Sequence, residues 1–417
     1  MKSVLFYSAA VALISSVFAD PIRVPLHRYN KRHHSHDYIA VPADNLMNGM
    51  MGGTISIGNP PQNFTVAFDT STGFSWVRGP QCGVENCEDR KIYDPRQSST
   101  AISSGRSFSM DYGEGFVNTT LYRDTFRFAG LEVKNMTFGA AYMMEYFDKG
   151  FDGYLGLGRN VNMSAYGSQF AKRDLSSSSF VPNAFQQSSG LSSAQFGMYT
   201  TTSGNGFSDS GVVSGVALNG IRDDNYSLVK RNDEPDGYLI LGGVAKDVIR
   251  GKLYHMDIDD DYPENWAVPV SQVSFVGENN FKVHKHARAV FSSSTDVIGL
   301  PNDQAAEFQK HWYAEYDKPD NTFKIPCCLM ERLPNFKITL GDVKITLPPR
   351  YWSHPRPVTS CCEMCRSHIG KSESDTDYVI GSALTNSFYT QFNSEKNTVS
   401  LGIKKNQIDD GLRLSKA

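Results

Sequence analysis

Two short segments of the chain resemble each other, and this repeat restricts the folds that the chain can adopt. The segment Phe68–Thr72 (FDTST) recurs 223 residues later as Phe291–Thr295 (FSSST). An apolar-apolar-Gly element follows each copy, Tyr154–Gly156 (YLG) in the first half and Val379–Gly381 (VIG) in the second. Similar elements in the same order in both halves indicate a duplicated domain, with a site where the two copies meet.

The composition favours strands around this repeat. The chain has 417 residues, of which 40% are hydrophobic, enough for two or three domains with their own cores. Gly and Ser are frequent and long runs of helix-forming residues are few, which favours short strands joined by turns over a helical bundle. We therefore expect a mostly β protein. The net charge of −3 argues against a nucleic-acid-binding protein that relies on a basic face.

The first 19 residues are typical of a secretory signal peptide. Lys2 precedes an apolar run from Val4 to Ile14, and small residues lead to a cleavage-type sequence at Val17–Ala19. This run is too short to span a membrane, and no later stretch reaches the roughly 20 apolar residues that a span needs. The C-terminus has neither a hydrophobic anchor nor a retention signal. We expect a secreted or vacuolar protein without a membrane span.

Changes in composition divide the rest of the chain. Residues 20–36 are basic and His-rich, with Arg28, Lys31 and Arg32 as candidate processing points. Strand and turn patterns follow, stop at a Ser/Gly/Asp-rich stretch and then resume at Gly237. We therefore assign a signal peptide to 1–19, a propeptide-like segment to 20–36, a first β-domain to 37–199, a linker or insertion to 200–235 and a second β-domain to 236–417.

Cysteines and glycosylation signals agree with a secretory route. All seven cysteines lie outside the expected signal peptide, and in an oxidising compartment disulfides are favoured over metal sites. Their odd number leaves at least one without a partner in the chain. Five N-x-[ST] acceptors occur, at Asn63, Asn118, Asn135, Asn162 and Asn225.

Four segments match, in the same order, the motifs of one known family. Gly53–Gln62 (GTISIGNPPQ) is similar to its opening hairpin, and Phe68–Val77 (FDTSTGFSWV) stands where the family has its first catalytic Asp-Thr-Gly loop. Tyr112-Gly113 resembles the tip of a flap over the substrate, and Phe151–Gly158 (FDGYLGLG) resembles the strand that threads the catalytic loop. The chain, from about Ile22 to Ile403, resembles the pepsin family of secreted aspartic proteases.

This resemblance implies a bilobal pepsin-like fold, in which two pseudo-symmetric β lobes enclose a cleft for an extended peptide or protein ligand. It implies a monomer without cofactors. Proteases of this family take one aspartate from each lobe, and the two carboxylates, about 3 Å apart, share one proton. The ionised aspartate activates the water that attacks the peptide carbonyl. Asp69 matches the first of these aspartates.

The resemblance also assigns roles around Asp69. Tyr112 and Gly113 match the flap, and Trp76 stands where relatives have a tryptophan that hydrogen-bonds the flap tyrosine. Thr70 and Ser293 keep hydroxyl groups at the positions where the two catalytic loops cross-link each other. The architecture of the cleft is therefore expected to be retained.

Disulfide expectations follow from the same resemblance. Cys82 and Cys87 match a small disulfide loop of the family. The pairs Cys327-Cys328 and Cys361-Cys362 enclose the interval of the family's C-terminal disulfide, so at least one bridge is expected between the two pairs. Cys365 is then the odd residue.

The second loop departs from the family pattern. Within an ungapped frame, Ser292 occupies the position of the second catalytic aspartate, and Asp296, four residues on, aligns with Gly73 of the first half. Ser71 and Ser294 replace the loop glycines, and each adds a Cβ where the backbone approaches the substrate. This pattern predicts a pseudoprotease.

Other chemistry is weakly supported by the residues. A nucleophilic Ser292 would need an aligned base, and nothing positions His284 or His286 for that role. Neither that pair nor His33–His36 offers a closed set of zinc ligands, and the acidic run Asp257–Asp261 lacks the features of a calcium loop. No metal is expected.

Three functions remain open. The first is a non-catalytic secreted protein that binds extended peptides in the cleft through strand-like backbone hydrogen bonds. The second is an acid endopeptidase, weakly or conventionally active, that uses Asp69. The third is a secreted glycoprotein in which the cleft has no role. Replacement of the second aspartate by Ser292 argues against the second, whereas retention of Tyr112 and Trp76 argues against the third.

Overall fold

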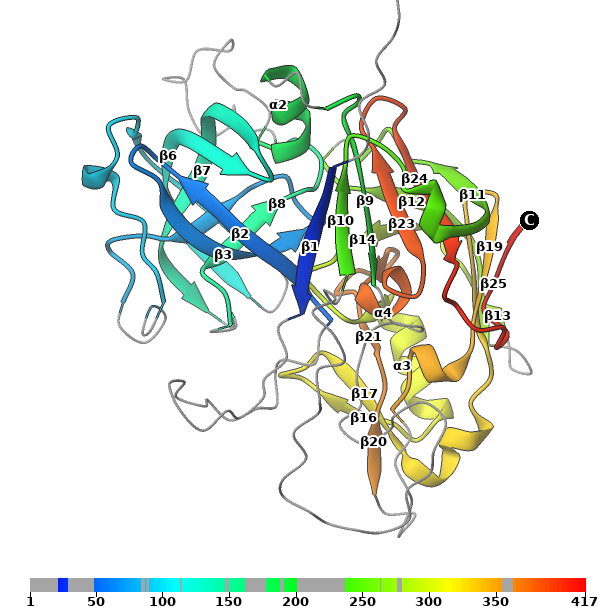
Figure 1. The fold of residues 1–417 in the computed structure, drawn as a ribbon. Helices are drawn as coiled ribbons and strands as arrows, with labels where there is room; N and C mark the ends of the chain where they lie inside the picture. Colours follow the sequence, from blue (N-terminus) through cyan, green and yellow to red (C-terminus); the bar gives the residue numbers. More distant parts are fainter. Residues whose placement is uncertain are drawn as a thin grey trace, which may run out of the picture.

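A computed structural model of the chain contains two β lobes joined by a shared sheet (Figure 1). It describes residues 22–28, 49–83, 87, 90–112, 115–145, 147, 150–161, 178–187, 191–200, 237–262, 264–275, 280–354 and 363–417. The expected mostly β, bilobal fold is confirmed. The expected signal peptide over 1–19 and residues 201–235 of the linker or insertion expected over 200–235 lie outside these residues, whereas Thr200 is described.

The largest sheet has 13 strands in the order β11-β24-β23-β9-β10-β1-β2-β3-β8-β4-β7-β6-β5. Its members are β1 (Ile22–Arg28), β2 (Met51–Ile57), β3 (Gln62–Asp69), β4 (Trp76–Arg78), β5 (Ile102–Asp111), β6 (Phe116–Phe128), β7 (Leu131–Glu145), β8 (Gly153–Gly156), β9 (Gln195–Thr200), β10 (Gly237–Leu241), β11 (Ile249–Asp257), β23 (Tyr389–Asn393) and β24 (Thr398–Lys404). Strands β2–β8 build the N-terminal lobe. The other six form the shared sheet between the lobes.

The C-terminal lobe contains a nine-stranded and a three-stranded sheet. The first comprises β12 (Ala267–Phe275), β13 (Asn280–Phe281), β14 (Arg288–Phe291), β15 (Ile298–Leu300), β18 (Phe336–Leu340), β19 (Val343–Leu347), β21 (Ile369–Lys371), β22 (Tyr378–Ile380) and β25 (Arg413–Lys416). The second comprises β16 (Glu315–Asp317), β17 (Thr322–Pro326) and β20 (Met364–Arg366).

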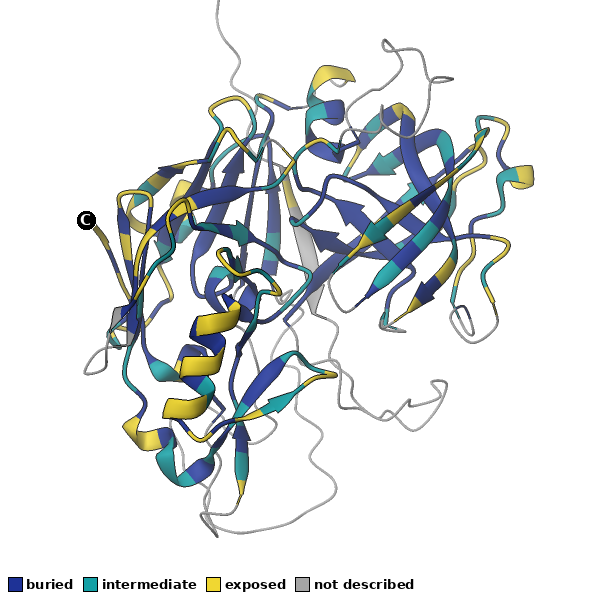
Figure 2. Ribbon diagram, turned by 180° about the vertical axis from the view of Figure 1, so that it is seen from behind, coloured by how far each residue is buried: buried dark blue, intermediate teal, exposed yellow. Residues whose placement is uncertain are grey.

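In the described part of the chain, helices are few and short. They are α2 (Phe180–Gln187), α3 (Asn302–His311) and α4 (Ser382–Thr385), with 3-10 turns η1 (Pro95–Gln97), η3 (Lys246–Val248), η4 (Cys327–Arg332) and η5 (Pro349–Tyr351). Helix α3 buries Ala305 and Phe308 against the C-terminal lobe and turns its other face to solvent (Figure 2). No helix among the described residues is long and apolar enough to cross a membrane.

The two lobes share one strand topology around the repeated segments. In the N-terminal lobe β3 runs parallel to β8, β8 runs antiparallel to β4, and β4 runs parallel to β7. In the C-terminal lobe the same relations hold for β14 with β22, β22 with β15, and β15 with β21. Glycine is needed where each threading strand ends, because a Cβ at Gly156 or Gly381 would lie within 2.4 Å of backbone atoms of the neighbouring loop.

Strand β1 links the lobes through backbone pairing on both of its edges. Ile22–Leu26 pair with β10, and His27 and Arg28 pair with Gly52 and Met51 of β2. The exposed Arg23 also forms an ion pair with Asp247 at 2.5 Å. Part of the segment expected to be a propeptide is therefore a strand of the shared sheet.

Candidate functional site

The two repeated loops meet where the lobes join. Asp69 is the last residue of β3, and Ser292 directly follows β14 in the other lobe. The backbone oxygen of Asp69 accepts a hydrogen bond from Leu157 after β8, and the backbone N–H of Ser292 donates to Ile380 of β22. The strand pairing thus gives Asp69 and Ser292 corresponding positions in the two lobes.

Thr70 and Ser293 fasten the loops to each other. The Thr70 N–H donates to Ser293 Oγ at 2.9 Å, and the Ser293 N–H donates to Thr70 Oγ1 at 3.0 Å. Each hydroxyl then donates across the junction, Thr70 to the Phe291 carbonyl and Ser293 to the Phe68 carbonyl. Both residues are buried, so four hydrogen bonds shielded from water fix the relative position of the two loops.

Asp69 is fully buried, and only one of its two oxygens is hydrogen-bonded. Oδ1 accepts the Ser71 N–H at 2.8 Å and the Ser71 hydroxyl at 2.5 Å. Oδ2 is buried without a hydrogen-bond partner among the described residues. Burial raises the pKa of Asp69 to about 6, although hydrogen bonds from Ser71, Ser294 and Thr72 favour the ionised form.

A line of three serine hydroxyls leads from Asp69 to the opposite loop. Beyond the Ser71 hydroxyl on Asp69, Ser71 Oγ lies 3.4 Å from Ser294 Oγ, which lies 2.9 Å from Ser292 Oγ. The two serines expected to crowd the loops therefore stand between Asp69 and Ser292. Neither has a left-handed backbone. Their side chains therefore affect the site by filling the space between the loops and not by straining the backbone.

Tyr112, the tyrosine expected in the flap, packs against the first loop. The Trp76 indole N–H donates to the Tyr112 hydroxyl at 3.0 Å, and Tyr112 makes edge-on contacts with the rings of Phe147 and Tyr154. Burial and the nearby negative charge of Asp69 raise the pKa of Tyr112 well above its usual value. The Tyr112 N–H donates to the Gly115 carbonyl across the turn. Gly113 lies outside the described residues.

Asp296 belongs to a separate buried cluster in the C-terminal lobe. Its Oδ2 accepts hydrogen bonds from Arg366 at 3.0 Å and interacts with His368 Nδ1 at 2.9 Å. The other ring nitrogen of His368 faces His354 Nε2 at 2.5 Å. Burial disfavours the charged form of Asp296, but the charges of Arg366 and the histidines outweigh it, so its pKa lies below the usual value.

No sequence pattern predicted this cluster or the role of Asn265. The Asn265 amide donates to the Ser71 carbonyl at 2.9 Å and thereby holds the first loop from the C-terminal lobe. The repeated segments do not include Asn265, Arg366, His354 or His368, and none of these residues belongs to a recognisable motif. Only the folded chain brings them to the loops.

One expected disulfide is present and one is paired differently. Cys82 and Cys87 are bonded, as the resemblance implied. Cys327 is bonded to Cys365, so the expectation of Cys365 as the odd residue is wrong. The reason is strand pairing: β17 and β20 place Ile325 opposite Cys365, two residues before Cys327. Cys328 has no disulfide partner among the described residues, which do not include Cys361 and Cys362.

The remaining predicted sites are surface features. Asn63 and Asn135 are exposed and Asn118 is half-buried on β6, whereas Asn162 and Asn225 lie outside the described residues. Of the histidines considered for zinc, His284 instead contacts Asp303 at 2.9 Å. In the described part of the chain no group of three or more His, Cys, Asp or Glu residues is placed to hold a metal ion.

Comparison with known proteins agrees with this architecture. A family model described as eukaryotic aspartyl protease matches residues 51–404. Pepsin A-5 of Mus musculus is 25% identical over 376 residues, covering 86% of this chain and 82% of its own length. Gastricsin of Callithrix jacchus is 22% identical over 350 residues, covering 83% of this chain and 79% of its own length.

Proposed function

Since the chain belongs to the eukaryotic aspartyl protease family, we propose that it is a secreted pepsin-like member that binds extended peptides between its lobes without cleaving them. In this proposal Ser292 replaces the second catalytic aspartate. Asp69 is the surviving member of the pair. The observation that carries the proposal is the line of hydroxyls from Asp69 through Ser71 and Ser294 to Ser292.

Acid peptide hydrolysis needs two carboxylates that share a proton on either side of a water. A serine hydroxyl does not ionise in the acid range, so Ser292 neither shares that proton nor raises the pKa of its neighbour by charge repulsion. The Ser71 and Ser294 hydroxyls also lie in the space between Asp69 and Ser292. The site therefore lacks a second carboxylate that could share the proton. It also has less room for the attacking water.

Two features of the site support peptide binding. The contact between Trp76 and Tyr112 keeps the flap tyrosine against the first loop. The Oδ2 of Asp69 has no hydrogen-bond partner among the described residues, and because it is buried, a bound peptide would contact it only after the residues that cover it move aside. An extended peptide can satisfy such groups with its own backbone, as a strand added to a sheet does.

Secretion, glycosylation and a monomeric state complete the proposal. The signal-peptide pattern over 1–19 supports entry into the secretory pathway, and the two disulfides agree with an oxidising compartment. The exposed positions of Asn63 and Asn135 suit glycan attachment. Delivery to the medium or to a vacuole is compatible with these features.

The decisive experiment measures cleavage and binding on the same purified, correctly folded chain. We expect no cleavage of a denatured protein substrate between about pH 2 and 6, the range of a shared-proton pair. Fluorescently labelled eight-residue hydrophobic peptides should nevertheless bind and remain intact by mass spectrometry. Cleavage that disappears in Asp69→Ala would instead establish an acid endopeptidase. Absence of both binding and cleavage would favour a purely structural glycoprotein.

A further inference from the structure

Two adjacent residues of the C-terminal lobe, Asn265 and Trp266, contact both loops from their place directly before β12. The Asn265 amide donates to the Ser71 carbonyl at 2.9 Å. The Trp266 indole N–H donates to the Leu157 carbonyl at 3.1 Å. Within its own lobe, the Trp266 carbonyl accepts the backbone N–H of Phe291 at 3.0 Å. The two residues thus reach both sides of the junction.

The three partners of this pair lie next to the ends of the hydroxyl line. Ser71 donates its hydroxyl to Asp69 at 2.5 Å. The Leu157 N–H donates to the backbone oxygen of Asp69 at 2.7 Å, and Phe291 directly precedes Ser292. The pair before β12 therefore holds the residues that place Asp69 on one side and Ser292 on the other.

The two members of the pair differ in how tightly they are packed. Trp266 is fully buried, with its ring centre 5.3 Å from that of Phe392 and 5.9 Å from the Arg159 guanidinium. Moving the indole would therefore disturb close packing against the shared sheet. Asn265 is half-buried, so removing its amide leaves no large cavity. A change at Asn265 can thus release Ser71 while the fold around it is kept.

Methionines occupy the corresponding positions of the N-terminal lobe. Ala267 of β12 pairs with the residue two before Ser292, and Gly52 of β2 pairs with the residue two before Asp69. The two residues before Gly52, Met50–Met51, are therefore the counterparts of the pair before β12. A methionine side chain carries no N–H donor. At these positions the loops are held by side-chain donors of the C-terminal lobe.

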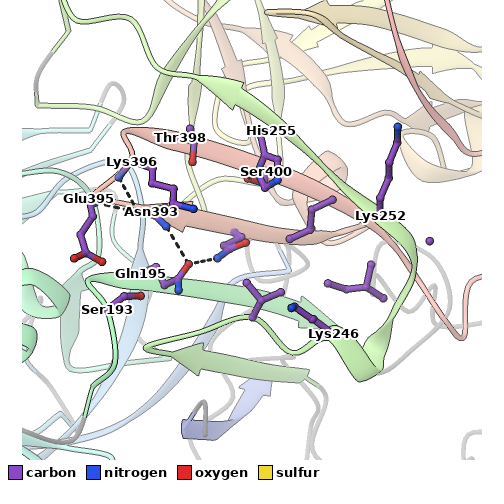
Figure 3. A pocket seen from close by; sticks show the side chains of 15 residues that line it. Ser193, Gln195, Lys246, Lys252, His255, Asn393, Glu395, Lys396, Thr398 and Ser400 are labelled. Carbon is purple, nitrogen blue, oxygen red and sulfur yellow. Dashed lines mark hydrogen bonds between the residues drawn. The ribbon is translucent and has the colours of Figure 1, made fainter. Parts of the chain in front are cut away.

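Ser71 is important because Asp69 has few other hydrogen bonds. In the pocket on the shared sheet, Gln195 accepts the Asn393 amide at 3.0 Å, and Asn393 accepts the Glu395 N–H at 3.0 Å (Figure 3). By contrast, Asp69 Oδ2 has no such partner among the described residues, and Oδ1 accepts the N–H and the hydroxyl of Ser71. These bonds favour the ionised carboxylate, which burial disfavours.

We propose that Asn265 is a positioning residue that holds the Ser71 hydroxyl on Asp69 from the opposite lobe. It acts through the Ser71 backbone and needs no contact with a ligand. Without this anchor the Ser71 loop shifts, and Asp69 loses hydrogen bonds to its charged form. Tyr112, which interacts with Asp69, stays neutral in the acid range because its pKa lies well above the usual value, so it does not compensate. The effect on Asp69 is independent of the proposed function, whereas any effect on peptide affinity rests on it.

A double-mutant cycle on the full chain tests this role. The stability change caused by Asp69→Asn is measured by urea unfolding at pH 3.5 and 7.5, with and without Asn265→Ala. At pH 7.5 this change reports the cost of ionising Asp69. Asn265→Ala should enlarge it by a factor of about ten in the unfolding equilibrium constant, the scale of a hydrogen bond to a charged group. At pH 3.5, where Asp69 is protonated in both proteins, the change should stay the same.

Asn386→Ala is the matched control. The Asn386 amide also links the lobes, because it donates to the Gly49 carbonyl at 3.1 Å, but this bond lies outside both loops. Its loss should lower stability at both pH values and leave the effect of Asp69→Asn unchanged. Asn265→Leu removes the donor while keeping the bulk and should behave like Asn265→Ala, so the test does not depend on one variant folding. Asn265→Gln keeps an amide and should restore most of the wild-type behaviour.

Two results would overturn the proposal. One is an effect of Asp69→Asn at pH 7.5 that is the same with and without Asn265, which would make Asn265 merely structural. The other is an equal change in Asn386→Ala, which would show general loosening between the lobes. A wild type that bound no peptide would remove the proposed function, whereas the unfolding cycle would still decide the role of Asn265.

Discussion

Thr70 and Ser293 each accept a hydrogen bond from the backbone N–H of the other, across the junction between the lobes. This reciprocal pair keeps the two loops in register even though the residues beside it, Asp69 and Ser292, differ. The scaffold and the chemistry of the site are therefore separable. Changes at Ser71, Ser292 and Ser294 can alter reactivity without loosening the junction.

Restoring the second carboxylate alone should recover little activity. Ser292→Asp supplies the missing proton partner, but Ser71 and Ser294 still occupy the space between the loops. The triple variant Ser71→Gly, Ser292→Asp and Ser294→Gly should show much higher kcat/KM for a denatured protein at acid pH. Loss of one member of a catalytic unit commonly costs about 10⁴-fold, which sets the scale of the gain.

A control of equal size makes this comparison decisive. In the same triple background, Ser292→Asn fills the same volume without a titratable proton and should stay inactive. If the asparagine version cleaved as fast as the aspartate version, the shared-proton explanation would be wrong.

Replacing Asp69 with asparagine should stabilise the protein at neutral pH. The folded pKa of Asp69 is about 6, above its usual value of 3.8, because burial disfavours the charge. The native state then holds a proton that the unfolded state releases, so Asp69 lowers the free energy of unfolding as pH rises from about 4 to 6.

Above pH 6 the ionisation of buried Asp69 lowers the free energy of unfolding by about 3 kcal/mol at most. Asp69→Asn should therefore raise the free energy of unfolding in urea at pH 7 and leave it nearly unchanged at pH 3.5. An equal change at both pH values would show that the effect comes from packing rather than from ionisation.

The buried pair of histidines should make the C-terminal lobe sensitive to acid. Burial, and to a lesser extent His354, lower the pKa of His368 to about 4, although Asp296 opposes the shift. Because the unfolded chain binds a proton at His368 below about pH 6.5 and the native protein does not, stability should fall between pH 6.5 and 4.

Between pH 6.5 and 4 the free energy of unfolding should fall by about 3 kcal/mol at most because of His368. His368→Gln should flatten the pH dependence of the urea unfolding midpoint in this range. His284→Gln changes a half-exposed histidine of the same lobe and serves as the control. If both variants retained the wild-type slope, His368 would not be the group responsible.

The revised disulfide pairing can be checked directly. The bond from Cys327 to Cys365 closes a loop with a sequence separation of 38 residues. The chain-entropy relation gives about 4 kcal/mol for a loop of this length. Cys365→Ser should lower the free energy of unfolding by up to that amount, whereas Cys328→Ser should change it little. Mass mapping of non-reduced peptides that joined Cys327 to Cys361 or Cys362 would contradict the pairing.

Sequence reasoning identified the fold because its signals are local. The hairpin, the two loops and the threading strands are short motifs in a fixed order, and the repeat together with these motifs predicted that Asp69 and Ser292 correspond. Cys365 was misassigned because its partner depends on the register of β17 with β20, which no local motif encodes. The neighbours of Asp296 were missed for the same reason: Arg366 and His368 lie about 70 residues further along the chain.

The double pairing of β1 bears on how the molecule would respond to a cut. Cleavage at Lys31 or Arg32 would break the covalent link but leave β1 hydrogen-bonded on both edges, to β10 and to β2. The product would be a two-chain complex that migrates as one particle under native conditions and as two polypeptides after denaturation. In such a molecule the cut itself would leave the contact between the lobes through β1 intact. That contact would be lost only when the small fragment dissociates.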